Sequence, residues 1–127
     1  MSKKTLVIGA SLKQIRYSNI AIKMLRDYNH EVVAIGLRKG NVLDVEILKA
    51  SNYNELLKLS IDDIHTVTLY LNAKRQVGYY DYIISLNPKR VIFNPGTENM
   101  EFMEILEKNN IEYEVACNLV LLRINQY

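Results

Sequence analysis

Small residues and a nearby arginine follow the first apolar run of the chain. Residues 5–8 read Thr-Leu-Val-Ile and lead into Gly9–Ser11 (Gly-Ala-Ser), with Arg16 and Ser18 a few positions later. Where a buried parallel strand ends in small residues before a helix, backbone amides and the helix N-terminus bind phosphate, because no side chain blocks the approach. The stretch therefore predicts a site for an anionic, nucleotide-like group at the end of strand one.

The segments that position this turn alternate between strand-like and helix-like patterns. Strands are expected at residues 5–8, 31–35, 66–71, 90–93 and 112–116, and helices at 19–28, 73–86 and 98–108. Shorter patterns predict an edge strand at 45–47, a helix at 53–59 and a closing apolar segment at 119–124. Ser18 and Asn72 are the expected N-caps of the helices that follow them, since their side chains can accept a backbone N–H.

Helices between strands imply parallel pairing through right-handed crossovers. We therefore predict a single α/β domain over residues 1–127. It is a Rossmann-like, doubly wound and mainly parallel sheet of about five to six strands, in an order near 3-2-1-4-5-6, with helices on both faces. Ligands of such sheets bind where strand one neighbours strand four. The loops expected to meet there are 9–18, 36–41, 71–74 and 94–97.

Composition and charge exclude several classes of function. The chain has 127 residues, 49% of them hydrophobic, and a formal net charge of +2. These values suit one globular domain, and the charge is too small to predict binding to nucleic acid or to a membrane. The N-terminal apolar run is far too short for a signal peptide or a membrane span. A single cysteine, Cys117, excludes an internal disulfide and suits a reducing compartment, so a cytoplasmic protein is expected.

The turn departs from the dinucleotide fingerprint G-x-G-x-x-G. Ser11 stands at the second glycine position and Gln14 is near the third. The acidic residue that binds the NAD ribose about 20 residues further on is missing, and Arg38 and Lys39 follow strand two instead. These cations suit a phosphate on the ribose, which both NADP and coenzyme A (CoA) carry. The loop at residues 9–18 is longer than the tight turn that binds a dinucleotide, and this favours CoA over NADP.

Motifs spread over the whole chain carry a family resemblance. They are residues 7–11 (Val-Ile-Gly-Ala-Ser), 16–18 (Arg-Tyr-Ser), 31–35 (Glu-Val-Val-Ala-Ile), 94–97 (Asn-Pro-Gly-Thr) and 117–121 (Cys-Asn-Leu-Val-Leu). In these motifs the chain resembles the small stand-alone CoA-binding proteins of bacteria. Their domain is similar to the Rossmann-type CoA-binding domain of succinyl-CoA synthetase α subunits. Many relatives have Asn-Pro at the tip of strand two, where this chain has Gly36 and Leu37. Because of this departure, the family's contacts to the adenine do not carry over directly to these two residues.

The resemblance implies which loop binds which part of CoA or of an acyl-CoA. The phosphates are expected on the first loop, at Gly9, Ala10, Ser11, Arg16, Tyr17 and Ser18. The adenosine is expected at the tip of strand two, at Gly36, Leu37 and Arg38. Leu71 and Asn72 stand at the tip of strand four, and the pantetheine arm would pass Asn94, Pro95 and Gly96.

Residues that could catalyse a reaction are few. His30 and His65 have no partners at metal-ligand spacing, so no metal site is predicted, and Cys117 is expected to be a small buried residue. No nucleophile, base and orienting group can be assembled from the sequence. We expect a protein that binds CoA without catalysis and that senses, buffers or presents it. An NADP-linked oxidoreductase and a ligand-free protein-interaction module of the same fold are the alternatives.

Three tyrosines, Tyr79, Tyr80 and Tyr82, cluster on the helix expected at residues 73–86. Their spacing does not allow all three to share one face of a regular α-helix. At least one is therefore expected to be exposed, where it could pack in a homodimer interface. The alternative is that the tyrosines cover the edge of the sheet.

Overall fold

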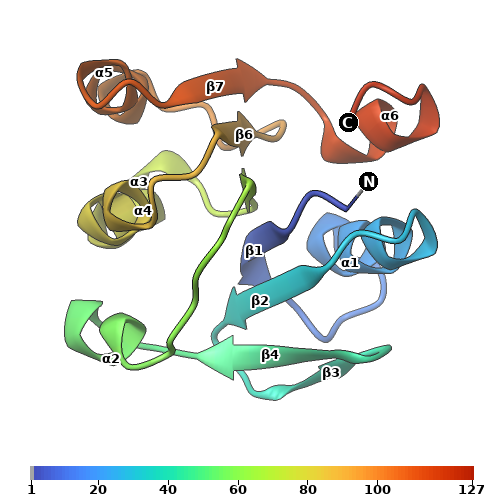
Figure 1. The fold of residues 1–127 in the computed structure, drawn as a ribbon. Helices are drawn as coiled ribbons and strands as arrows, with labels where there is room; N and C mark the ends of the chain where they lie inside the picture. The colour runs from blue at the N-terminus through green and yellow to red at the C-terminus, as the bar shows by residue number, and fades with distance from the viewer. Residues whose placement is uncertain (1) are drawn as a thin grey trace.

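The computed structural model describes residues 2–127, which form a twisted sheet covered on both faces by helices (Figure 1). Within these residues the strands are β1 (Thr5–Ala10), β2 (Val32–Gly36), β3 (Gly40–Val42), β4 (Val45–Lys49), β5 (Thr66–Leu69), β6 (Arg90–Phe93) and β7 (Glu112–Val115). Their order is β3-β4-β2-β1-β5-β6-β7, and all neighbours are parallel except the β3–β4 pair. Without β3, the strands follow the predicted order, so the Rossmann-like fold is confirmed.

Helices cover the two faces of the sheet in two groups. They are α1 (Tyr17–Asp27), α2 (Tyr53–Leu57), α3 (Ala73–Gln76), the 3₁₀ turn η1 (Val77–Tyr79), α4 (Tyr80–Leu86), α5 (Met100–Lys108) and α6 (Asn118–Arg123). Figure 1 shows α1 and α6 together on one face, with α2, α3, α4 and α5 on the other. No helix in the described part of the chain is long and apolar enough to cross a membrane.

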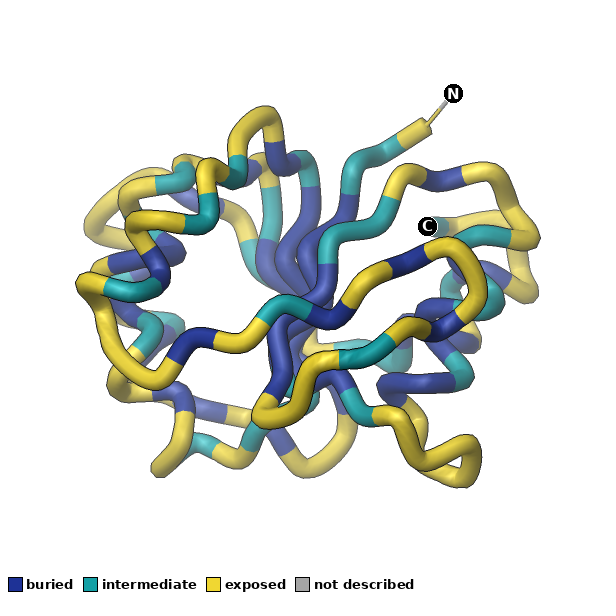
Figure 2. Tube along the Cα trace, turned by 90° about the horizontal axis from the view of Figure 1, so that it is seen from below, coloured by how far each residue is buried: buried dark blue, intermediate teal, exposed yellow. Residues whose placement is uncertain are grey.

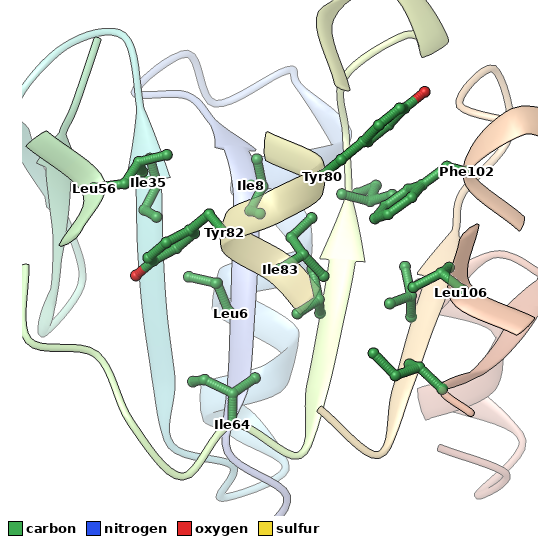
Figure 3. Close-up of a cluster of buried hydrophobic side chains, with 14 of the residues drawn as sticks. Leu6, Ile8, Ile35, Leu56, Ile64, Tyr80, Tyr82, Ile83, Phe102 and Leu106 are labelled. Atoms are coloured by element: carbon green, nitrogen blue, oxygen red, sulfur yellow. The ribbon is translucent and has the colours of Figure 1, made fainter. Parts of the chain in front are cut away.

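Strand β1 is buried on both sides because its side chains alternate between two cores. Leu6 and Ile8 face the helices α2, α4 and α5, where they join Ile83 and Phe102 (Figure 3). Val7 faces the core beneath α1 and α6. A strand covered on both faces is apolar at every position, and this explains why its sequence shows no alternation. The buried strands lie at the centre of the molecule, with exposed residues on the loops and outer helix surfaces (Figure 2).

The helix predicted over residues 73–86 is divided into α3, η1 and α4. Because a 3₁₀ turn has about 3.0 residues per turn, it changes the direction in which the following side chains point. Tyr80 and Tyr82 are both buried in the core (Figure 3). Tyr79 is half-buried. Tyr80 also stacks on Phe102, with ring centroids 4.4 Å apart. The prediction that one of the three is exposed is wrong, and the homodimer hypothesis loses the surface on which it rested.

A short hairpin at the edge of the sheet was missed by the sequence analysis. Residues 40–42 form β3, which is the edge strand. The strand predicted at the edge, at residues 45–47, is β4 and lies second, between β3 and β2. The tight turn at Leu43 and Asp44 has no glycine or asparagine, which are the usual sequence signals of such turns. Arg26 of α1 holds this turn by two hydrogen bonds to the Asp44 carboxylate, of 3.0 Å from Nε and 2.7 Å from Nη2.

Candidate functional site

A cavity of about 580 Å³ opens at the carboxyl ends of β1, β2, β5 and β6. This volume is typical of small-molecule sites. The position is the switch point of the sheet, at the boundary between β1 and β5, where ligands of doubly wound folds bind. Four loops that are distant in the sequence form the wall, and these are the four loops that the sequence analysis brings together.

Every predicted site residue except Asn94 lines this cavity. These residues are Gly9, Ala10, Ser11, Arg16, Tyr17, Ser18, Gly36, Leu37, Arg38, Leu71, Asn72, Pro95 and Gly96. The sequence analysis missed Leu12, Lys13, Tyr70, Arg75, Tyr79 and Thr97. Leu12, Lys13 and Thr97 belong to loops that were predicted, so reading those loops as a whole would have found them. Tyr79 carried no such signal, because its position depends on the break between α3 and α4.

The turn after β1 requires glycine. Gly9 has a φ of +93°, a conformation that L-residues with side chains rarely adopt. A Cβ atom at this position would lie 2.9 Å from the backbone carbon of Tyr70. The turn therefore packs directly against the end of β5, which leaves no room for a side chain at this position.

Helix α1 begins without a side-chain cap. Its N-cap is Arg16, whose side chain accepts no hydrogen bond from the helix, and Ser18 lies buried within the first turn. The prediction that Ser18 is the N-cap is therefore wrong, because the helix begins earlier than the apolar periodicity indicates. Asn19 ties the loop to the helix, since its Nδ2 donates to the Ser11 carbonyl at 2.9 Å. Uncapped N–H groups at a helix start are suited to bind an anion.

The cavity is strongly cationic. Lys13, Arg16, Arg38 and Arg75 line it, and no aspartate or glutamate does. None of these four side chains takes part in an ion pair among the described residues. The whole chain has 16 basic and 14 acidic residues, so this concentration of positive charge is local rather than a property of the composition. Such a cavity attracts anions and holds them by charge-assisted hydrogen bonds.

Asn94 does not line the cavity; its side chain holds neighbouring elements together by hydrogen bonds. It is buried, and its Nδ2 donates to Thr68 Oγ1 at 2.7 Å and to the Leu69 carbonyl at 2.9 Å. Its Oδ1 accepts the backbone N–H of Asn118 at 2.8 Å. These bonds join β5, β6 and the start of α6, and so they set the position of the neighbouring Pro95, which is exposed and lines the cavity.

Buried Gln76 joins the two loops on the β5–β6 side of the cavity. Its Nε2 donates to the carbonyl oxygens of Leu71 at 2.8 Å and of Thr97 at 2.7 Å. Its Oε1 accepts a hydrogen bond of 2.9 Å from Asn99. The sequence analysis assigned no role to this glutamine. Asn72 caps α3 as predicted, accepting the Arg75 backbone N–H at 3.0 Å, and so α3 is held at the cavity rim.

Both histidines lie at the amino ends of the strands, opposite the cavity. His30 precedes β2 and accepts the Lys3 backbone N–H on Nδ1 at 2.9 Å, and His65 precedes β5 and bonds Thr66 Oγ1 at 2.8 Å. Burial lowers the pKa of His30, with a further contribution from Lys3. Burial also lowers the pKa of His65, helped by the charge of Arg90. Both rings are therefore neutral in the fold at pH 7.

These lowered pKa values predict a loss of stability in mild acid. An unfolded histidine binds a proton below about pH 6.5, whereas the folded rings resist protonation. The unfolded state therefore binds more protons, and the free energy of unfolding rises with pH between about 5 and 7. Urea unfolding at several pH values measures this dependence. The His30→Gln and His65→Gln variants are each expected to show a shallower rise. An unchanged slope in both variants would assign the pH dependence to other groups.

Comparison with known proteins identifies the family to which this Rossmann-like protein with a cationic cavity belongs. Residues 3–123 match the family described as CoA binding domain. The chain belongs to this CoA-binding family, and CoA binding in general is the property that the family supports. None of the curated proteins matches the chain. Within residues 2–127, no group of three or more histidine, cysteine, aspartate or glutamate side chains could hold a metal ion.

Solved structures share this fold over most or all of the chain. One, described as an uncharacterized protein, is 42% identical with a TM-score of 0.89, covering 100% of this chain and 99% of its own. A Thermus thermophilus protein is 16% identical with a TM-score of 0.80, covering 99% of this chain and 91% of that one. A hypothetical protein from Pyrococcus horikoshii OT3 is 26% identical with a TM-score of 0.74, covering 91% and 77% respectively.

Proposed function

We propose that this protein binds CoA or an acyl-CoA in the cavity at the carboxyl edge of the sheet, without catalysing its conversion. The observation that carries the proposal is the charge of the cavity: Lys13, Arg16 and Arg38 lie on the loops after β1 and β2, and no carboxylate lines the wall. CoA presents a pyrophosphate and a ribose 3′-phosphate, and these anions match such a wall. Membership of the CoA-binding family supports the same ligand class.

The phosphates have a defined place in this proposal. The pyrophosphate lies on the turn at Gly9 and on the first amides of α1, where Arg16 donates charge-assisted hydrogen bonds. Arg38, at the tip of β2, takes the 3′-phosphate. The pantetheine arm then crosses Leu71 and runs toward Pro95 on the β6 side. The lining residues and the order of the strands support this direction.

A binding role rather than an enzymatic one is supported by the chemistry of the wall. Its residues include no aspartate, glutamate, histidine or cysteine that could act as a nucleophile or a general base. Burial raises the pKa of the Tyr70 and Tyr79 hydroxyls, so both stay protonated at pH 7. The proposed role is therefore to sense, buffer or present CoA in the cytoplasm, whose reducing conditions suit the unpaired Cys117.

Thermal unfolding with four ligands tests the proposal. A ligand present at about 100 times its dissociation constant stabilises the folded state by about 2.7 kcal/mol, which shifts the unfolding midpoint clearly. We expect CoA to raise the midpoint most, dephospho-CoA to raise it less because Arg38 loses its phosphate, and NAD to have no effect.

The same experiment separates the alternatives. A larger shift with NADP than with CoA would contradict the proposal and favour an NADP-linked oxidoreductase. The absence of any shift in a folded sample would favour a protein-interaction module that keeps the fold but not the ligand. Equal shifts with CoA and dephospho-CoA would leave CoA binding intact but contradict the assignment of the 3′-phosphate to Arg38.

A further inference from the structure

Arg75 and Tyr79 form a polar corner of the cavity, separate from the phosphate loop. Arg75 belongs to α3 and Tyr79 to η1, one helical turn later, and both line the cavity. Burial raises the pKa of the Tyr79 hydroxyl, and the charge of Arg75 lies close enough to oppose this rise. The Tyr79 ring packs against the core beneath α4 and α5. Among the described residues, no carboxylate pairs with Arg75, and the Tyr79 hydroxyl has no side-chain hydrogen-bond partner.

This corner lies across β1 from Arg38. In the sheet, β1 separates β2, whose tip carries Arg38, from β5, which precedes Arg75. Each strand spacing is about 4.8 Å, so the two arginines approach the cavity from different sides. Helix α3 also covers the opposite face of the sheet from α1, which begins at Arg16 (Figure 1). The proposed function assigns the three phosphates of CoA to the turn, Arg16 and Arg38, and so it assigns no anion to Arg75.

We propose that Arg75 and Tyr79 bind a carboxylate at the end of the acyl chain, so that the ligand is a CoA thioester of a dicarboxylic acid. This inference rests on the proposed function, because it needs the adenosine at β2 and the phosphates at β1. The sulfur end of the pantetheine arm then reaches the β5–β6 side, where the corner lies. The planar guanidinium of Arg75 donates two parallel N–H bonds to a carboxylate, and the Tyr79 hydroxyl donates one more.

Two stable CoA thioethers of equal length test the inference. S-(3-carboxypropyl)-CoA ends in a carboxylate, whereas S-butyl-CoA ends in a methyl group, and both resist hydrolysis. Isothermal titration calorimetry with the wild-type protein is expected to show a preference of about tenfold to a hundredfold for the carboxylated ligand. In Arg75→Met this preference falls to about onefold, because any general effect of the lost charge on CoA binding is shared by both thioethers. Tyr79→Phe loses a smaller part of the preference.

Lys74 provides the matched control. It is a neighbouring exposed cation on α3 that does not line the cavity, so Lys74→Met is expected to keep the full preference. Equal binding of the two thioethers by the wild type, together with tight binding of CoA, would overturn the inference and leave the proposed function standing. Loss of the CoA preference over dephospho-CoA in Arg75→Met would also overturn it, by assigning Arg75 to the 3′-phosphate. Failure to bind CoA at all would reject both.

Discussion

Replacing Gly36 by alanine (Gly36→Ala) is expected to lower the free energy of unfolding by about 1–3 kcal/mol and to weaken CoA binding. Gly36 ends β2 and pairs with Ala10 at the end of β1. An added Cβ would clash with the Ala10 carbonyl oxygen and would lie 3.0 Å from Cγ2 of Ile47. Neither neighbour can move easily, because one is strand backbone and the other is a buried side chain of β4.

The same substitution is expected to disturb the site because it forces apart two of its walls. The loop after β1 and the loop after β2 also touch further out, where Leu12 packs on Gly40 so closely that a Cβ there would lie 2.6 Å from Leu12 Cδ2. These contacts set the spacing of the two loops that carry the cavity residues Arg16 and Arg38. Separating β1 from β2 moves the two cations relative to each other, so the two phosphate groups of one ligand no longer fit both.

Gly78 is the matched control for this experiment. It lies in η1, and an added Cβ would meet nothing within 4 Å. Gly78→Ala is therefore expected to be neutral or to stabilise the protein by up to about 1 kcal/mol, since alanine restricts the unfolded chain. Urea unfolding compares the two variants, and calorimetry compares their CoA affinities. A Gly36→Ala variant as stable as the wild type would contradict the close packing of β1 on β2.

Replacing Arg16 by alanine (Arg16→Ala) is expected to weaken CoA binding by about 1.5–3 kcal/mol, or about tenfold to more than a hundredfold, as is typical for a hydrogen bond to a charged group. Arg16 is the N-cap of α1, lines the cavity and pairs with no carboxylate among the described residues. Its charge adds to that of the helix N-terminus at the point assigned to the pyrophosphate. Because the side chain is exposed, the stability of the ligand-free protein should not change.

Lys23 supplies the control for Arg16. It lies on the same helix, away from the cavity wall, and Lys23→Ala removes the same charge from α1. Calorimetric titration with CoA should show wild-type affinity for this variant, and a weaker salt dependence of CoA binding for Arg16→Ala, since one phosphate contact is lost. Unchanged CoA affinity in Arg16→Ala would refute the assignment of the pyrophosphate to this loop, while CoA binding itself would remain.

The strands and the glycine turn after β1 could be predicted from the sequence because their signals are local. Strands covered on both faces are continuous apolar runs, and the turn after β1 combines small residues with a following helix. The strand order near 3-2-1-4-5-6 followed from the alternation of strands and helices, since crossovers are right-handed. Helix boundaries were less accurate, as at Ser18, because the first turn of α1 contributes polar residues that the apolar periodicity does not include.

The tertiary structure alone decided which side chains reach the cavity and which support it. Asn94 follows a buried strand just as Pro95 does, yet it turns inward because Thr68 and Asn118 offer it partners from distant segments. Tyr79 lines the cavity only because the helix breaks at η1. Contacts between residues far apart in the chain leave no periodic trace in the sequence, whereas a strand, a cap or a turn is built from neighbours. The sequence by itself therefore determined the fold and the end of the sheet at which the cavity lies, and long-range packing determined which side chains line that cavity.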